Sequence, residues 1–129
     1  MFDRYVFTEN SCKNVLNNGE IVGFEMQTQL NYYRGIPCSM VQDVTVTVDG
    51  VDVPREEIFF SPDGIDYFTL SQLETVAEIK WEFGQKATVF VKRPGGLSQG
   101  SHEVYLATTL RIAYMPVPIT GEKTRTVTI

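Results

Sequence analysis

A two-residue alternation of apolar and polar side chains constrains this sequence more than any other feature. Between residues 44 and 48, valines alternate with polar side chains, and Asp49-Gly50 follows at once, with Val51 and Val53 beyond. Such alternation places one face of a strand in a core and the other in water. An Asp-Gly pair between two such runs favours a type I′ turn, which requires positive φ. The sequence therefore predicts a β-hairpin closed by Asp49 and Gly50.

The same alternation recurs along most of the chain. Residues 77–83 show it most clearly, and residues 2–8 hold a short aromatic run typical of a first or edge strand. About eight to ten short strands with turn signals every ~8–12 residues indicate a sandwich or barrel. We predict an all-β fold, an antiparallel two-sheet β-sandwich, with residues 1–129 as a single domain. The side chains predicted to face the core are Phe24, Met26, Leu30, Val44, Val46, Val48, Ile79, Trp81, Phe83, Val89, Val91, Leu106, Leu110 and Ile112.

Helical signals are short. Ser71 and Glu74 have the spacing of a capping box, so residues 71–76 are expected to form one helical turn. Nothing longer is expected there, and the whole fold should contain at most a helical turn or two.

Composition excludes several classes of partner. Acidic residues outnumber basic ones by 16 to 11, which gives a formal charge of -5. Nucleic acid and anionic membranes attract clustered Lys and Arg, so neither is an expected partner. No apolar run approaches the ~20 residues that span a bilayer, and residues 1–4 lead into a polar segment without a secretion signal. We therefore expect Cys12 and Cys38 to be thiols in a cytoplasmic protein.

Catalytic residue types are scarce. His102 is the one histidine of the sequence, so neither a histidine-based metal site nor a Ser-His-Asp triad with a spare histidine is expected. Cys12 and Cys38 lack CxxC spacing. The glycine-rich residues 94–100 lack the lysine and the helix of a phosphate loop, so they are interpreted as an inter-strand connection. His102 is interpreted as a surface or strand-capping residue. No catalytic residue and no metal site are predicted in this chain.

Residues 30–40 have unusual chemistry for a connection between strands. Two tyrosines, Arg34, Ile36 and Met40 surround one glycine and one proline, where a solvated loop carries small polar residues. Tyr and Arg most often dominate protein interfaces. Two interpretations remain open: these side chains plug the open end of the sandwich core, or they form a docking surface with residues 114–118 as a second patch. The partner contacts predicted by the docking interpretation are Tyr32, Tyr33, Arg34, Gly35, Ile36, Pro37, Tyr114, Met115 and Pro116.

Several segments resemble the small, or β, subunit of bacterial C-glycoside deglycosidases. They include Met1-Phe2-Asp3-Arg4, Tyr32-Tyr33-Arg34-Gly35-Ile36-Pro37, Val46-Thr47-Val48-Asp49-Gly50, Trp81-Glu82-Phe83-Gly84 and Pro94-Gly95-Gly96-Leu97. The resemblance implies a non-catalytic small subunit of a carbon–carbon lyase complex, paired with a larger TIM-barrel α subunit in an αβ hetero-oligomer. It also implies that the larger subunit carries a divalent metal, usually manganese, and that this chain needs no cofactor. The implied reaction cleaves the sugar–aglycone bond of 3-oxo-C-glycosides with flavonoid-type aglycones by metal-assisted elimination.

A second class of function remains open. An acidic β-sandwich with 12% aromatic residues is also compatible with a stand-alone carbohydrate-binding domain, in which Trp81 or the tyrosines stack on sugar rings. A third possibility is an Ig-like structural module. Trp81 shares its predicted face with Ile79 and Phe83, which favours a core position over a sugar-stacking one.

Overall fold

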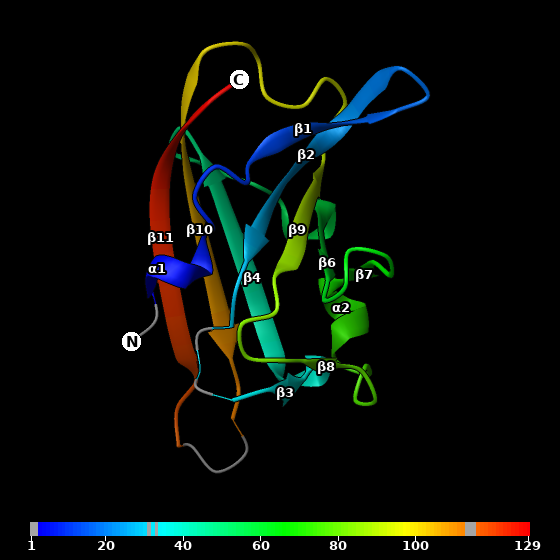
Figure 1. Ribbon diagram of the computed structural model, residues 1–129, viewed down its shortest axis with the longest axis vertical. Coiled ribbons are helices and arrows are strands. Elements are labelled where there is room, and N and C mark those ends of the chain that lie inside the picture. Colours follow the sequence, from blue (N-terminus) through cyan, green and yellow to red (C-terminus); the bar gives the residue numbers. More distant parts are fainter. Residues whose placement is uncertain (1–2, 31, 33, 113–115) are drawn as a thin grey trace.

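The chain folds into two antiparallel sheets that pack face to face (Figure 1). The computed structural model describes residues 3–30, 32, 34–112 and 116–129. Within these residues the elements are α1 (Asp3–Val6), β1 (Lys13–Asn17), β2 (Glu20–Thr28), β3 (Ile36–Pro37), the 3₁₀ turn η1 (Cys38–Met40), β4 (Val41–Val48), β5 (Val51–Asp52), the 3₁₀ turn η2 (Arg55–Glu57), β6 (Ile58–Ser61), β7 (Phe68–Thr69), α2 (Leu70–Leu73), β8 (Lys80–Trp81), β9 (Ala87–Lys92), β10 (Ser101–Leu110) and β11 (Ile119–Thr128).

The two sheets differ in size. The five-stranded sheet has the order β1-β2-β9-β6-β7, and the four-stranded sheet has the order β11-β10-β4-β5. A third, two-stranded ladder pairs β3 with β8. These eleven strands of the described residues exceed the expected eight to ten because four of them are only two residues long. The predicted all-β sandwich with little helix is confirmed.

The core lies between the two sheets and follows the predicted alternation. Met26 on β2 pairs with Val89 on β9, and Val89 pairs in turn with Phe60 on β6. All three side chains are fully buried, and Leu106 on β10 of the other sheet is buried in the same core cluster. Every side chain predicted to face the core is buried except Ile79 and Phe83. Removing this apolar surface from water is the main favourable contribution to folding.

The predicted strand over residues 77–83 is wrong. Only Lys80 and Trp81 form a ladder there, opposite β3. Ile79 and Phe83 are 36% and 53% exposed, although Trp81 between them is fully buried. The segment crosses the open end of the sandwich (Figure 1), and the backbone hydrogen bond from Gln85 to Glu82 turns it back after Trp81. Alternation in the sequence therefore continues beyond the two residues that pair with β3.

The predicted strand at residues 2–8 is also wrong. Within it, Asp3–Val6 form α1, which lies beside β11 (Figure 1). Val6 and Phe7 are buried in the core from this helical turn. The amide of Thr8 donates to the carbonyl of Gln27, and the amide of Gln29 donates to the carbonyl of Tyr5. The aromatic run thus buries its side chains and attaches to the end of β2 without forming a ladder.

The second helix forms near the predicted turn but begins with a different cap. The Thr69 hydroxyl accepts from the amide of Gln72, and the Gln72 side chain accepts from the amide of Thr69. This reciprocal pair is a capping box two residues earlier than the Ser71–Glu74 pair that the sequence indicated. The shift moves Leu70 and Leu73 into the core, which decides between the two spacings.

The predicted hairpin is confirmed. Asp49 and Gly50 have φ values of 49° and 82°, and they connect β4 to β5 with Val48 opposite Val51. None of the helices in the described residues is long and apolar enough to cross a membrane.

Candidate functional site

The described part of residues 30–40 closes the lower end of the sandwich in Figure 1, where β3 crosses beside β8. Tyr32 and Ile36 are only 4% and 5% exposed, and Ile36 pairs with Trp81. These two side chains therefore belong to the core, as the plug interpretation predicts. Arg34 is exposed, whereas Gly35 and Pro37 are half-buried. A contact of these residues with a partner stays a prediction.

The end of this stretch lies next to the second predicted patch. The amide of Arg111 donates to the carbonyl of Met40 over 2.8 Å, which ties the chain after β10 to η1. Between them lies a groove of about 730 Å³, here called the end groove. Its lining residues are Ser39, Met40, Gln42, Glu74, Arg111, Ile112, Pro116, Val117 and Pro118. The structure thus brings Pro116 to the residues that follow Pro37, while Tyr33, Tyr114 and Met115 lie outside the described residues.

Local backbone chemistry fixes both walls of the end groove. The amides of Cys38 and Ser39 donate to the carbonyls of Ile79 and Val76, which holds η1 in place. On the other wall, Val117 is 63% exposed and stands between Pro116 and Pro118, whose rings restrict the backbone. The groove therefore presents an apolar side chain on a preorganised backbone, which lowers the entropic cost of binding.

Gly35 has a separate reason to lack a side chain. A Cβ at this position would lie 2.7 Å from a carboxylate oxygen of Glu82. The glycine therefore leaves the space that the Glu82 side chain occupies.

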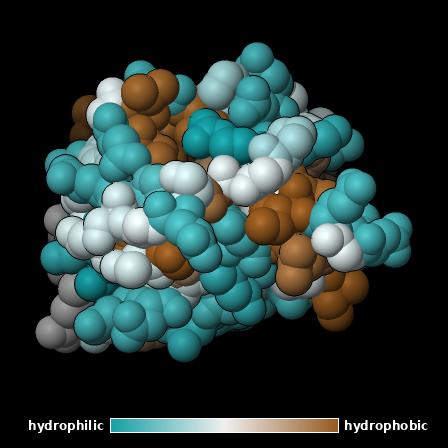
Figure 2. All heavy atoms as spheres, turned by 90° about the horizontal axis from the view of Figure 1, so that it is seen from above, coloured by the Kyte–Doolittle hydropathy of each residue, from teal (hydrophilic) through white to brown (hydrophobic). Residues whose placement is uncertain are grey.

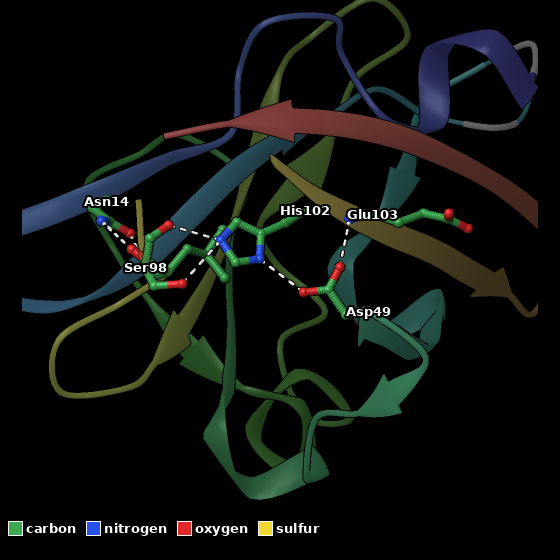
Figure 3. A network of polar contacts seen from close by, with 6 residues as sticks. Asn14, Asp49, Ser98, His102 and Glu103 are labelled. Carbon is green, nitrogen blue, oxygen red and sulfur yellow. Dashed lines mark hydrogen bonds and ion pairs between the residues drawn. The ribbon is translucent and has the colours of Figure 1, made fainter. Parts of the chain in front are cut away.

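At the opposite end of the sandwich, a polar network joins the glycine-rich connection to both sheets (Figure 3). Asn14 on β1 makes two hydrogen bonds to Leu97, one to its amide and one to its carbonyl, at 2.8 and 2.9 Å. His102 on β10 reaches Asp49 through Nδ1 at 2.8 Å and the carbonyl of Ser98 through Nε2 at 2.7 Å. The other oxygen of Asp49 accepts from the amide of Glu103. Sequence reasoning missed this network because its members lie up to 83 residues apart.

The network contains a serine, a histidine and an aspartate, but its geometry is not that of a nucleophilic triad. Neither the Asp49 carboxylate nor the Ser98 carbonyl can donate a proton, so both imidazole nitrogens of His102 must donate. Accepting partners on both sides raise the pKa of His102, with the Asp49 hydrogen bond first and the Ser98 carbonyl second. The Ser98 hydroxyl is farther from Nε2, at 3.4 Å. Nε2 makes its shorter hydrogen bond to the Ser98 carbonyl and not to the hydroxyl, so it is not placed to accept the serine proton, and the network connects the glycine-rich segment to the turn between β4 and β5.

The two cysteines are free thiols. Burial raises the pKa of Cys12 to about 12 and that of Cys38 to about 11. Both are therefore protonated near neutral pH, and the thiol is a far weaker nucleophile than the thiolate. Among the described residues, no group of three His, Cys, Asp or Glu side chains is placed to hold a metal ion.

A β-sandwich with a preorganised, partly apolar groove at one end has the features of a domain that binds another molecule at its surface. Comparison with known proteins gives its family: residues 2–114 match the C-glycoside deglycosidase beta subunit family, and the chain belongs to it. It is therefore a subunit of a deglycosidase enzyme, and the name of the family implies an alpha subunit as its partner. The resemblance predicted from the sequence is confirmed.

Individual relatives agree with this assignment. The chain is 32% identical to a C-glycoside deglycosidase beta subunit of Eubacterium cellulosolvens, over 88% of this chain and 78% of the relative. It is 36% identical to a 3'-dehydrocarminate deglycosidase beta subunit of a Microbacterium species, over 74% of this chain and 70% of the relative. A beta subunit of Arthrobacter globiformis is 32% identical over 74% of this chain.

Proposed function

We propose that this chain is the small accessory subunit of a complex that cleaves the carbon–carbon bond between the sugar and the aglycone of 3-oxo-C-glycosides. The observation that carries the proposal is the family match over residues 2–114. The catalytic centre lies on the larger subunit, a TIM barrel with a divalent metal, and the small subunit contributes binding surface. Glycosides with flavonoid-type aglycones are the expected substrates, and the complex acts in the cytoplasm.

The chemistry of the bond explains why such a complex needs a 3-oxo substrate. A C-glycosidic bond has no leaving oxygen that an acid could protonate. A carbonyl at C3 acidifies the proton at C2, and a divalent metal on the larger subunit would stabilise the negative charge that develops there. Elimination of the aglycone from C1 then follows, with a general acid supplying the proton that the aglycone carbon takes up.

Within the complex, we propose that the exposed part of residues 32–37 and the end groove contact the larger subunit. Arg34 is exposed at this end of the sandwich, and Val117 stands out from the groove wall. The buried Tyr32 and Ile36 support this surface from beneath. The sugar-stacking alternative loses its main side chain, because Trp81 is fully buried.

Reconstitution tests the proposed function. The chain and its larger subunit are purified separately, mixed, and supplied with a 3-oxo-C-glycoside, and released aglycone is measured by liquid chromatography. We expect rapid release from the mixture and little from either subunit alone. Full activity of the larger subunit without this chain would contradict the proposal.

Substitution of Arg34 tests the proposed contact. We expect Arg34→Ala to weaken assembly by ~2 kcal/mol, or roughly 30-fold. Arg55→Ala is the matched control, because Arg55 is an exposed arginine on η2 that pairs with Asp43 at 3.2 Å. Affinity is measured by biolayer interferometry and stability by thermal denaturation. If Arg34→Ala lowers the melting temperature and leaves affinity unchanged, residues 32–37 serve the core alone.

A further inference from the structure

The outer face of the five-stranded sheet carries a groove that the sequence analysis did not identify. This groove, here called the sheet groove, has a volume of about 560 Å³. Its lining residues are Val15, Leu16, Asn17, Val22, Glu25, Phe59, Tyr67, Phe90 and Lys92. Figure 2 looks down on this end of the molecule, and apolar atoms gather there beside the hydrophilic tip of the β1–β2 hairpin at the right. The sequence signal for this groove is a phenylalanine at each of two positions, Phe59 and Phe90, that the alternation assigns to the solvent-facing side of the sheet.

Three aromatic rings form the floor and one wall of the sheet groove. Phe59 and Phe90 are opposite each other on β6 and β9, with ring centroids 6.1 Å apart. Tyr67 meets Phe90 edge-on at 6.4 Å. Gly23 makes room for this cluster, because a Cβ there would lie 2.9 Å from the end of the Phe90 ring. The glycine and the rings together create an apolar surface on the side of the sheet that faces away from the core.

The outer face of the other sheet is built differently. Threonines alternate outward along β11, and Tyr105 on β10 donates its hydroxyl to Glu122 over 2.7 Å. Thr109 and Thr120 are linked across the ladder at 3.2 Å, and Thr47 donates to Asp52. This face satisfies its polar groups internally and suits solvent. The apolar groove on the five-stranded sheet therefore has the character of an interaction surface.

We propose that the sheet groove is a second docking surface for the larger subunit, which places an apolar side chain between Leu16 and Phe90. This inference rests on the proposed function, since it requires the complex to exist. The interface of an obligate complex usually buries upwards of ~2,000 Å², which is more than one loop supplies. Glu25 and Lys92 line the sheet groove, so the partner is expected to carry charges of the opposite sign around its apolar contact.

Two other occupants fit less well. A second copy of this chain would bring together two molecules that each carry a formal net charge of -5, which disfavours association. A small ligand is usually enclosed over most of its surface. Here the side chains that form the walls are themselves open to solvent, with Leu16 67% and Tyr67 42% exposed.

Leu16 and Val51 provide a matched pair for the test. Leu16 is 67% exposed on β1 of the five-stranded sheet, and Val51 is 66% exposed on β5 of the four-stranded sheet. Each stands beside a hairpin turn, so an aspartate at either position adds the same charge at a similar exposure. Leu16→Met restores an apolar side chain of similar volume and serves as the conservative variant.

The experiment measures the affinity of each variant for the purified larger subunit by biolayer interferometry, with circular dichroism to confirm folding. We expect Leu16→Asp to weaken binding at least tenfold, and Leu16→Met and Val51→Asp to change it less than threefold. Tyr67→Ala, which shortens the wall without adding charge, should weaken binding at least fivefold. Equal effects of Leu16→Asp and Val51→Asp, or no effect of either, would overturn the proposal.

Light scattering on the chain alone separates the remaining outcomes. A dimer of the isolated chain that Leu16→Asp dissociates would assign the groove to a second copy and overturn the proposal. Failure of the unaltered chain to bind the larger subunit at all would count against the proposed function itself. If the unaltered chain binds the larger subunit and Leu16→Asp binds it with the same affinity, only the sheet groove is removed from the interface.

Discussion

Replacement of Trp81 by phenylalanine tests the burial pattern at the lower end of the sandwich. Trp81 is fully buried, its ring meets Phe60 edge-on at 5.1 Å, and its indole N–H donates to the carbonyl of Gln85 over 2.9 Å. Phenylalanine cannot make this hydrogen bond, which costs roughly 1 kcal/mol. The part of the site left unfilled costs roughly another 1–2 kcal/mol. We therefore expect Trp81→Phe to lower the free energy of unfolding by roughly 2–3 kcal/mol.

Phe83 is the matched control, because it belongs to the same alternating segment but is 53% exposed. We expect Phe83→Ala to cost less than about 1 kcal/mol. Urea denaturation followed by circular dichroism measures both values, since tryptophan fluorescence is lost with the one tryptophan of the chain. Thermal denaturation should show a melting temperature lower by roughly 10 °C for Trp81→Phe. Equal destabilisation by the two substitutions would mean that both side chains share a buried face, and would refute the structural argument.

Three further predictions concern single groups. The pKa of His102 is raised in the fold, so its stabilising contribution is complete below the unfolded pKa of about 6.5 and is lost as pH rises through the folded value. The urea midpoint of the unaltered chain should therefore exceed that of His102→Asn by more at about pH 5.5 than at about pH 8.5. The same difference at both pH values would contradict this prediction. Cys38 is buried with its pKa raised to about 11, so a thiol reagent should label it slowly in the folded chain and fast in urea, whereas equal rates would place it at the surface. Gly23→Ala should destabilise the chain by ~2 kcal/mol or more because its Cβ would collide with the carbonyl oxygen of Val91, and an unchanged urea midpoint would exclude that close approach.

Much of the fold could be predicted because period-two alternation is a local property that the sandwich uses directly. Val44, Val46 and Val48 face the core as their spacing predicts, and Asp49-Gly50 turns the chain because its backbone accepts positive φ. Such signals depend on neighbours within a few residues, so the sequence alone displays them. The family resemblance was likewise available from the sequence, because it rests on the order of residues.

The site could be predicted only in part. The docking interpretation counted Tyr32 and Ile36 as surface contacts, and the structure buries both. Residues 30–40 have the composition of either a core plug or an interface, because both use large apolar and aromatic side chains. What distinguishes them is the position of β8 beside β3, and that pairing joins segments more than 40 residues apart in the sequence.

Tertiary structure alone decided three other features. The alternation over residues 77–83 buries Trp81 but exposes Phe83, because a strand needs a neighbour and the chain turns away after Trp81. The raised pKa of His102 follows from acceptors that the turn between β4 and β5 and the glycine-rich connection supply. The sheet groove exists because Gly23 leaves room for an aromatic ring from the adjacent strand. Local sequence determines which face of a strand is apolar, whereas long-range pairing determines what that face meets.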